Sequence, residues 1–528
     1  MTSEQQFNFY PDLVEHQAVT LGDKPYIYHE DQVVSFADFD RATCRAANGL
    51  VALGAAAGDG AAILMDNCLE YLYLFYGLPR AGFFSVPINT ALKGDGLKYI
   101  LENSGVRYLV VDEGYYPEIE RLGINIGHIE KIIVRQTSGG SPDKGLMNLE
   151  TFFKADDAKP DHQMNNDAIA YLMYTSGTTG FPKGVVNRNS SANLQGLLAL
   201  GGITYQPGDI LYTTLPLFHA NALILTPGFS MGMGLPMALE KRFSASGFWD
   251  SVRRYRGTVF NALGAMVPIL MKQPEKPDDA DNPVRLVITS ACPASLWEAF
   301  EKRFNVKIWE AYGAVDGGGL LTFNFGDAPV GSIGKVITPH EWKLVDDDGN
   351  SVPAGEIGEL VSRSTTSGGG NVEYYKNNEA SKKKIRDGWV HSGDYFRADE
   401  AGNLFFVDRK SDCIRRRGEN ISSFEVETMV EKHPDVLECA AFGVPSDLGE
   451  DEVMIWLKPR PGTQLDLQDI IKHCKQNMAY FMIPRFIDMV DHIPRTETLR
   501  IQKKEMKARG VSDCTWDREK QMPDFKVK

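Results

Sequence analysis

A loop of hydroxyl residues and glycines follows a strand-like segment in the first half of the chain. The segment Tyr171–Tyr174 leads into Thr175-Ser-Gly-Thr-Thr-Gly180, and Pro182-Lys183-Gly184 closes the stretch. Glycines let backbone N–H groups approach an anion closely, hydroxyls donate to phosphate oxygens, and the lysine supplies positive charge. Gly180 is not followed directly by Lys and Ser or Thr, so the stretch is not a Walker A motif. A surface turn is the simpler alternative, but the length and order of the residues favour a polyphosphate-binding loop. Its candidate residues are Thr175, Ser176, Gly177, Thr178, Thr179, Gly180 and Lys183.

Two charged residues later in the chain also suit a nucleotide. The carboxylate of Asp394 can accept hydrogen bonds from both ribose hydroxyls, and the guanidinium of Arg409 can serve phosphate or ribose oxygens. Taken singly, each is better interpreted as a solvated surface charge. Their interpretation therefore depends on the motifs around them.

The elements that must position these residues can be predicted from short apolar runs. Residues 36 to about 360 alternate strand-like segments, such as Tyr108–Asp112 and Leu286–Thr289, with helix-like segments such as Ala37–Leu53. Alternation of this kind predicts an α/β fold with mostly parallel sheets. A chain of 528 residues also exceeds the usual size of one hydrophobic core, so at least two domains are expected.

The character of the sequence changes after residue 408. A basic stretch, Arg409–Arg417, is followed by helix and strand patterns that predict a small α+β domain. These patterns are a helix over Ser423–His433, strands over Leu437–Val444 and Glu452–Leu457, and a helix over Leu467–Met478. We therefore predict a large multi-subdomain N-terminal domain, residues 1–408. A small mobile C-terminal domain, residues 409–528, would follow a hinge near 408–412.

Composition and charge argue against several classes of protein. The net charge of −14 argues against a nucleic-acid partner or an anionic membrane surface. Seven cysteines without a CxxC pair or metal-ligand spacing suit reduced thiols in a cytoplasmic protein. Residues 1–17 lack the long apolar run of a secretory signal. The uncharged stretch Ala220–Leu239 contains prolines and glycines, which favour a buried core segment over a transmembrane helix. We expect a cytoplasmic monomer or homodimer.

Several motifs in the same order resemble the acyl-adenylating superfamily of acyl-CoA synthetases, peptide-synthetase adenylation domains and firefly luciferase. Thr175–Gly184 is similar to its phosphate-binding signature. The other similar segments are Leu78–Asn89, Leu215–Ala220, Trp389–Asp394, Phe406–Arg409, Arg417–Ile421 with Glu425 and Glu427, and Gly443–Glu450. Within the superfamily the chain resembles the crotonobetaine/carnitine-CoA ligase-like group, through Gln476–Pro484 and Gly510–Asp517.

The resemblance implies ATP, Mg²⁺ and coenzyme A as cofactors, and it assigns roles to particular residues. Tyr312 and Gly313 would join the ATP site, with Tyr312 stacked on adenine, and Asp316 would hold Mg²⁺, a hard ion that prefers oxygen ligands. Further implied sets are an acyl pocket at His219, Ala220, Ala291, Cys292 and Gly317, a C-terminal CoA motif at Gly418, Glu419 and Asn420, and a hinge at Ser411. The candidate catalytic residues are Lys183, His219 and Arg500, with His219 as a wall or gate of the pocket and not a general base.

Two departures from the superfamily lie in the adenine-binding segment, which usually ends Tyr-Gly-x-Thr-Glu and here reads Tyr312-Gly-Ala-Val-Asp316. Val315 lacks the hydroxyl that would contact the α-phosphate. Asp316 keeps a carboxylate but is one methylene shorter than glutamate. Its reach to a metal would therefore need backbone movement or a water molecule.

The third departure concerns the catalytic lysine of the superfamily's C-terminal domain. The position of that lysine is occupied here by Arg500. Replacement of lysine by arginine keeps the positive charge but changes the shape of the side chain. Lys503 or Lys504 is the alternative cation. At the expected pivot Ser411 stands where aspartate or lysine is common, and a small polar residue still permits a backbone rotation.

The sequence therefore predicts an AMP-forming carboxylic acid:CoA ligase. A carboxylate would attack the α-phosphate of ATP to give acyl-AMP and pyrophosphate, and the acyl group would then pass to the CoA thiol. One alternative is an enzyme that loads a carrier protein. Another is a weakened nucleotide-binding member of the family, motivated by Val315, Asp316 and Arg500. Candidate pocket residues without lysine or arginine favour an aliphatic or alicyclic monocarboxylic acid, and a quaternary-ammonium acid of the carnitine type is also open.

Overall fold

The computed structural model describes residues 7–123, 128–138, 146–175, 182–337, 339–365, 372–416, 419–446, 451–496 and 501–526. The chain forms two compact units. One comprises Met1–Gly331, Val336–Glu341 and Arg363–Val390, and the other Ser332–Lys335, Trp342–Ser362 and His391–Lys528. Residues 342–362 and 391–408 thus group with the C-terminal elements, and the point at which a mobile domain begins stays a prediction.

A nine-stranded sheet, which belongs to the first unit apart from Lys335, has the order β16-β15-β14-β13-β12-β10-β11-β1-β2. Its strands are β1 (Pro25–His29), β2 (Gln32–Ser35), β10 (Leu211–Thr213), β11 (Met237–Leu239), β12 (Val259–Leu263), β13 (Leu286–Ser290), β14 (Lys307–Ala314), β15 (Gly319–Asn324) and β16 (Lys335–Val336). Neighbouring strands from β1 through β11, β10, β12 and β13 to β14 are parallel. Helices α7 (Ser191–Thr204), α8 (Thr226–Met233), α9 (Phe248–Tyr255), α10 (Met266–Met271) and α11 (Ala294–Phe304) lie between these strands in the sequence.

A seven-stranded sheet of the same unit has the order β7-β6-β5-β3-β4-β8-β9. Its strands are β3 (Gly60–Leu64), β4 (Phe84–Pro87), β5 (Tyr108–Asp112), β6 (Lys131–Arg135), β7 (Met147–Asn148), β8 (Ile169–Thr175) and β9 (Lys183–Arg188). Among the pairs that these seven strands form with one another, β8–β9 is antiparallel and the others are parallel. Along β3, Ala61 and Ile63 join one buried cluster while Ala62 and Leu64 join another. Since successive side chains of a strand point to opposite faces, both faces of this sheet are buried, which explains its continuous apolar runs.

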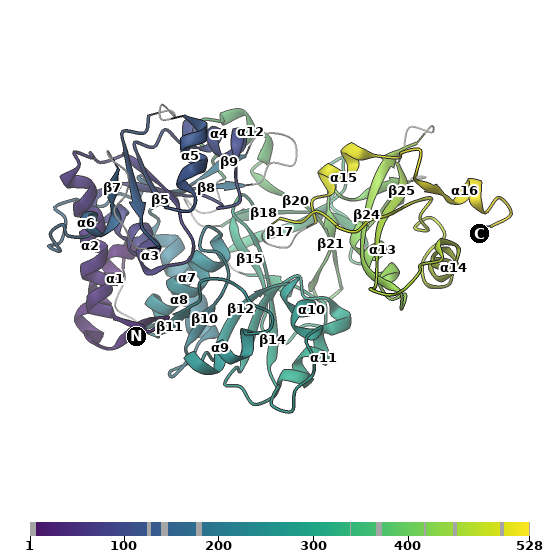
Figure 1. Cartoon of the computed structure of the whole chain (residues 1–528), viewed down its shortest axis with the longest axis horizontal. Coiled ribbons are helices and arrows are strands. Elements are labelled where there is room, and N and C mark those ends of the chain that lie inside the picture. Colours follow the sequence, from purple (N-terminus) through teal and green to yellow (C-terminus); the bar gives the residue numbers. More distant parts are fainter. Residues whose placement is uncertain are drawn as a thin grey trace. The chain divides into compact units, whose positions relative to one another are not determined.

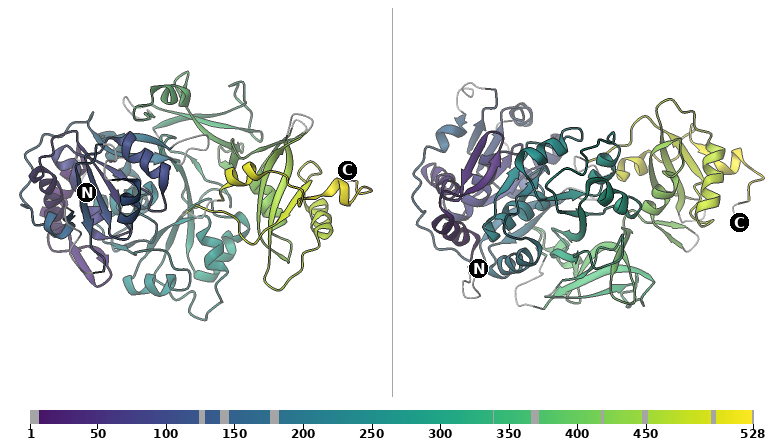
Figure 2. Two further views of the ribbon diagram at one scale, coloured as in Figure 1. Left: turned by 45° about the horizontal axis from the view of Figure 1, so that its top comes forward. Right: turned by 90° about the horizontal axis from the view of Figure 1, so that it is seen from below.

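The helices of the N-terminal part pack on these sheets. They are α1 (Tyr10–Leu21), α2 (Phe36–Ala52), α3 (Leu69–Gly77), the 3₁₀ turn η1 (Leu78–Ala81), α4 (Gly94–Ser104), α5 (Tyr116–Leu122) and α6 (Leu149–Phe152). Helices α1 and α2, purple in Figures 1 and 2, pack against each other. Helix α2 begins after Ser35, whose hydroxyl accepts a hydrogen bond from the Asp38 N–H and caps the helix.

A further sheet contains strands that are divided between the two units. It has the order β17-β18-β20-β19, with β21 paired to β20. These strands are β17 (His340–Val345), β18 (Ile357–Ser364), β19 (Ile385–Arg386), β20 (Trp389–Ala398) and β21 (Leu404–Arg409), and α12 (Asn378–Lys384) precedes β19.

The C-terminal part of the second unit is a small α+β structure. Its elements are β22 (Ile414–Arg416), β23 (Glu419–Ile421), α13 (Ser423–Val430), β24 (Val436–Pro445), β25 (Asp451–Pro459), α14 (Leu467–Asn477), β26 (Phe486–Met489), α15 (Lys503–Arg509), β27 (Trp516–Asp517) and α16 (Arg518–Gln521). Along β24, Cys439 and Ala441 join a buried cluster with α13 and α14, whereas Ala440 and Phe442 join a cluster with Met506 of α15. The sheet is therefore covered on both faces.

The predicted α/β class is confirmed. Strands β5 and β13 and helix α2 lie where the apolar patterns placed them, as do α13, β24, β25 and α14 in the C-terminal part. The uncharged stretch Ala220–Leu239 forms the π-helical turn η2 (Asn221–Leu225), helix α8 and strand β11, and Ala222, Leu223 and Met231 are fully buried. No helix in the described part of the chain is long and apolar enough to cross a membrane.

Candidate active site

The predicted phosphate loop joins β8 to β9. These strands are antiparallel, and their register places Thr175 opposite Lys183, so the two ends of the loop are held side by side. The Thr175 hydroxyl donates to the backbone carbonyl of Lys183 at 3.5 Å. Ser176, Gly177, Thr178, Thr179 and Gly180 lie outside the described residues.

Tyr374 connects the lysine of this loop to Asp316. The Lys183 Nζ lies 5.2 Å from the centre of the Tyr374 ring, and the Tyr374 hydroxyl donates to Asp316 Oδ2 at 2.7 Å. Burial, together with the neighbouring Asp316 carboxylate, raises the pKa of Tyr374 well above its ordinary value, so this phenol stays protonated and can donate. Two residues that lie far apart in the sequence, 183 and 316, are thus separated by a single side chain.

Backbone pairing fixes Tyr374 at this place. Val185 of β9 forms an antiparallel bridge with Tyr374. The Val186 N–H donates to the Glu373 carbonyl at 2.8 Å, and the Tyr375 N–H donates to the Gly184 carbonyl at 2.7 Å. Residues 373–375 therefore continue the sheet beyond β9, and the sequence motifs do not reveal that contact.

Asp316 is the residue that the sequence assigns to Mg²⁺. Its side chain is 24% exposed, and Lys384 Nζ lies 3.7 Å from Oδ2. Within the described ranges, no group of three or more His, Cys, Asp or Glu residues is arranged to hold a metal ion. Mg²⁺ commonly uses one or two carboxylates and completes its shell with phosphate and water oxygens. One carboxylate beside a phosphate loop fits a metal that arrives with ATP, and this role stays a prediction.

The predicted acyl-pocket residues follow the carboxyl ends of neighbouring parallel strands. His219 and Ala220 come after β10, Ala291 and Cys292 after β13, and Gly317 after β14. Since β10, β12, β13 and β14 are successive parallel neighbours, these segments emerge at one edge of the sheet. Ligands of open α/β sheets bind outside this edge. Tyr312 and Gly313 belong to the last residues of β14 at the same edge.

Glu310 of β14 holds the turn that follows β13, a contact that sequence reasoning missed. Its side chain is 2% exposed, and it accepts hydrogen bonds from the Thr289 hydroxyl, the Ala291 N–H and, at 3.2 Å, the Cys292 N–H. Burial raises the pKa of Glu310 to about 7, although these hydrogen bonds act in the opposite direction. The one available signal was an acidic residue inside the apolar run of β14.

The turn held by Glu310 is tightly constrained. Ala291 adopts a left-handed backbone conformation with φ 68°, which is uncommon for a residue with a Cβ. The Gly264 N–H donates to the Ser290 carbonyl at 2.7 Å, and a Cβ at Gly264 would lie 1.9 Å from the Ala291 carbonyl oxygen. Glycine is therefore required at 264 for β12 and this turn to approach each other.

Asp394 and Arg409, the candidate ribose ligands, are opposite one another in the β20–β21 pair. Cross-strand partners present their side chains on the same face, so one ligand can meet both. The buried carboxylate of Glu359 supports this segment, because it accepts from the Gly393 N–H at 3.1 Å and contacts Lys410 Nζ and His391 Nδ1, each at 3.1 Å. Burial acts to raise the pKa of Glu359, but His391 and Lys410 outweigh it and hold that pKa below its ordinary value.

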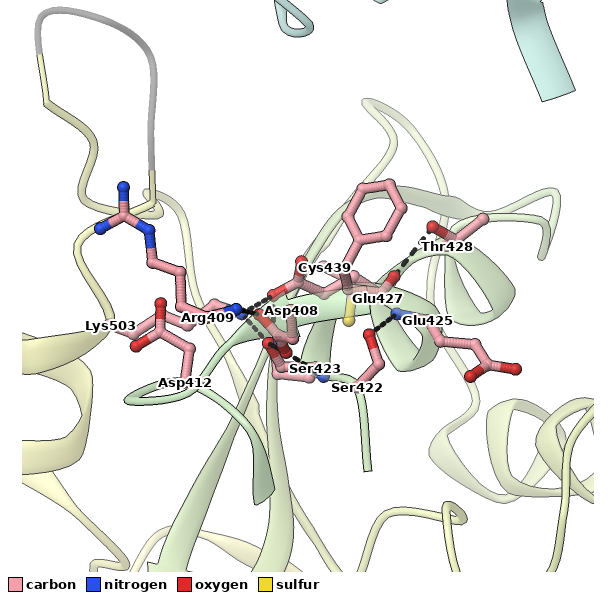
Figure 3. Close-up of polar contacts among 12 residues, drawn as sticks. Asp408, Arg409, Asp412, Ser422, Ser423, Glu425, Glu427, Thr428, Cys439 and Lys503 are labelled. Carbon is pink, nitrogen blue, oxygen red and sulfur yellow. Dashed lines mark hydrogen bonds and ion pairs between the residues drawn. The ribbon is translucent and has the colours of Figure 1, made fainter. Parts of the chain in front are cut away.

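Lys503, one alternative for the catalytic cation, is enclosed within the second unit (Figure 3). Its side chain is 10% exposed; Nζ lies 2.7 Å from Glu427 Oε1 and donates to the Ser423 hydroxyl. Ser423 donates in turn to Asp408 Oδ2, through its N–H and its hydroxyl, each at 2.6 Å. Burial acts to lower the pKa of Lys503, but the carboxylates of Glu427 and Asp408 outweigh it, so the lysine stays charged. Its engagement there favours another cation for catalysis.

The remaining C-terminal candidates are placed only in part. Arg500 and Gly418 lie outside the described residues, whereas Lys504 is exposed on α15. Glu419 and Asn420 belong to β23, opposite Arg416 and Arg415 of β22. Ser411, the predicted pivot, is exposed, and its carbonyl accepts a hydrogen bond from Lys507 Nζ at 2.9 Å.

Comparison with known proteins gives consistent matches along the chain. Residues 14–370 match the model of the AMP-binding enzyme family, and residues 425–499 match that of the AMP-binding enzyme C-terminal domain. A crotonobetaine/carnitine–CoA ligase of Salmonella paratyphi C is 30% identical over 508 residues, which cover 93% of this chain and 97% of that protein.

Solved structures of CoA ligases are also similar to this chain over most of its length. The anthranilate CoA ligase AuaEII in complex with anthranoyl-AMP superimposes with a TM-score of 0.86 at 26% identity, covering 96% of this chain and 99% of that one. The O-succinylbenzoate coenzyme A synthetase MenE of Bacillus subtilis, in complex with AMP, gives a TM-score of 0.80 at 26% identity, covering 94% and 98%.

Proposed function

The chain belongs to the AMP-binding enzyme family of AMP-forming acid–thiol ligases, and from this premise we propose that it activates a carboxylic acid as its acyl-AMP and transfers the acyl group to coenzyme A. In the first half-reaction an oxygen of the substrate carboxylate bonds to the α-phosphorus of ATP. The bond between that phosphorus and the oxygen bridging to the β-phosphate breaks, and pyrophosphate leaves. In the second half-reaction the CoA thiol loses its proton and its sulfur bonds to the acyl carbon. The bond between that carbon and the phosphate oxygen breaks, and AMP leaves with the electron pair.

The observation that carries this proposal is the arrangement around Tyr374. A phosphate-loop lysine, Lys183, and a carboxylate, Asp316, lie on either side of one buried phenol. Adenylation needs a cation to meet phosphate charge and a carboxylate to fix a metal–nucleotide complex, with little covalent work by the protein. When bound, Mg²⁺ would neutralise phosphate charge and draw electrons from the α-phosphorus.

Other residues of the chain supply binding and orientation in this proposal. Tyr312 stacks on adenine, while Asp394 and Arg409 hold the ribose from one face of the β20–β21 pair. Arg500 meets the charge that develops between carboxylate and α-phosphate. Rotation about residues 408–412 then withdraws Arg500 and admits the thiol. We also propose a cytoplasmic enzyme, as monomer or homodimer.

The acid is proposed by chemical class. The segments expected to line the acyl pocket, 219–225, 290–293 and 313–319, contain no lysine or arginine that would pair with a second carboxylate. Ala222, Leu223 and Cys292 in these segments are buried and apolar. We therefore propose a monocarboxylic acid, aliphatic or alicyclic. A quaternary-ammonium acid of the carnitine type is the second candidate, which the name of the Salmonella relative favours.

The test is product identification from a mixed acid library. Purified protein is incubated with ATP, Mg²⁺ and CoA, and pyrophosphate release and acyl-CoA mass are followed for each acid. The proposal expects both products from the same acid. Pyrophosphate release with acyl-AMP but no acyl-CoA would favour loading of a carrier protein. ATP binding without release of pyrophosphate across the library would favour a weakened nucleotide-binding protein.

A further inference from the structure

Helix α12 ends in three consecutive lysines, two of which face a depression beside Lys183. The depression has a volume of about 430 Å³ and is lined by Lys183, Asn377, Glu379, Ala380, Lys383 and Lys384. All of these residues belong to the first compact unit. The neighbouring Lys382 is exposed and is not part of the lining.

Lys384 is paired with Asp316, one of the positions where the sequence departs from the superfamily pattern. Its side chain is 15% exposed, and Nζ lies 3.7 Å from Asp316 Oδ2, the oxygen that also accepts from Tyr374. Val315 packs in one apolar cluster with Ala380 of α12 and Ile385 of β19. Helix α12 thus contacts Asp316, where the carboxylate is shorter, and packs against the same buried cluster as Val315, where a hydroxyl is missing.

We propose that Lys183, Lys383 and Lys384 bind inorganic pyrophosphate in this depression, and the β- and γ-phosphates of ATP before it. The inference rests on the proposed adenylating function and adds a second cationic wall to its phosphate loop. When the bond from the α-phosphorus breaks, the bridging oxygen keeps the electron pair, and negative charge grows on the leaving pyrophosphate. Ammonium groups donate hydrogen bonds to that charge.

The described contacts of Lys183, Lys383 and Lys384 are compatible with this binding. Lys383 Nζ lies 2.6 Å from Glu379 Oε1, but both side chains are more than 70% exposed, and such surface pairs contribute little. The pair of Lys384 with Asp316 keeps the ammonium group in place beside the depression. Lys183 lies over the Tyr374 ring, a contact that leaves hydrogens of the ammonium group able to donate.

Direct titration of pyrophosphate tests the inference. Binding to the full-length protein is measured by calorimetry without acid, CoA or divalent cation, for the natural protein and for Lys384→Ala, Lys383→Ala and Lys382→Ala. We expect the Kd to rise about tenfold in Lys384→Ala and severalfold in Lys383→Ala, because each loses a charge-assisted hydrogen bond that is partly screened. Lys382→Ala removes an equal charge from the same helix and should change the Kd less than about twofold.

The Lys384→Arg variant and an assay of acyl-AMP formation complete the test. Lys384→Arg retains the positive charge and should restore most of the affinity, so it decides the matter if Lys384→Ala fails to fold. Equal weakening by all three alanine variants would overturn the site, because it would reveal only the general charge of the helix. Lysine-dependent pyrophosphate binding in a protein that forms no acyl-AMP would overturn the proposed function alone. Unchanged binding in the variants of an active ligase would overturn this inference alone.

Discussion

Replacing Glu310 by glutamine should change how the stability of the β13–α11 turn depends on pH. Glu310 is 2% exposed, and burial raises its pKa from 4.5 to about 7. Folding therefore favours the protonated carboxyl group. The stabilisation that this proton provides is complete below pH 4.5 and is lost as the pH rises through about 7. At about 1.4 kcal/mol per pKa unit, the loss amounts to about 3 kcal/mol.

Glutamine keeps the shape of the side chain and does not titrate. Its amide oxygen can accept from the Ala291 N–H, and its amide nitrogen can donate to the Thr289 hydroxyl oxygen. The variant should therefore lack the pH-dependent contribution while retaining the turn. Between about pH 5 and a pH above about 7, the turn of the natural protein should lose up to about 3 kcal/mol of stability. The turn of Glu310→Gln should not show this loss.

Hydrogen exchange provides a local assay for this prediction. Exchange of peptides containing Ala291 and Cys292 is followed between about pH 5 and about pH 8, and opening free energies are compared at each pH. Glu298→Gln, an identical change at an exposed position on α11, serves as the control. Parallel pH curves for the natural protein and Glu310→Gln would refute the reasoning, since the carboxyl group would then be equally ionised in the closed and open turn.

The remaining predictions concern the candidate nucleotide-binding residues and the candidate catalytic cations. Lys183→Ala should weaken ATP binding or slow adenylation without unfolding the protein, and unchanged ATP kinetics would remove the lysine from the site. Asp394→Ala should raise the KM for ATP, because two charge-assisted hydrogen bonds of about 1.5–3 kcal/mol each are lost. Equal use of ATP and 2′,3′-dideoxy-ATP by the natural enzyme would contradict this. Arg500→Ala should slow adenylation roughly a hundredfold and leave thioester formation from preformed acyl-AMP nearly intact. In the same half-reaction assays, Lys504→Ala should have little effect. Lys503→Ala should chiefly lower stability, by about 3–5 kcal/mol, because it leaves a buried carboxylate unpaired. Loss of adenylation in a lysine variant alone would show that Arg500 is not the catalytic cation.

The sequence by itself determined the elements and the order of the motifs. Strands β5 and β13 appear as short apolar runs, and helix α2 as a helix-like segment, because these patterns are local properties of consecutive residues. The prediction that the loop from Thr175 to Lys183 binds phosphate also rests on consecutive residues. Glycines, hydroxyls and a lysine within one short segment carry the chemistry of phosphate binding without help from distant residues.

Only the tertiary structure decided which side chains meet. The bridge between Val185 of β9 and Tyr374 places Tyr374 beside Lys183, although nearly two hundred residues separate Lys183 from Tyr374 in the sequence, and Tyr374 donates to Asp316. The burial of Glu310 against Ala291 depends on β13 and β14 being parallel neighbours. In the sequence Lys503 was an alternative to Arg500 as the catalytic cation, but in the structure it is paired with Glu427. The period of a strand or helix follows from the local backbone conformation of consecutive residues. The contacts named here depend instead on sheet order and on the cost of leaving a buried charge unpaired.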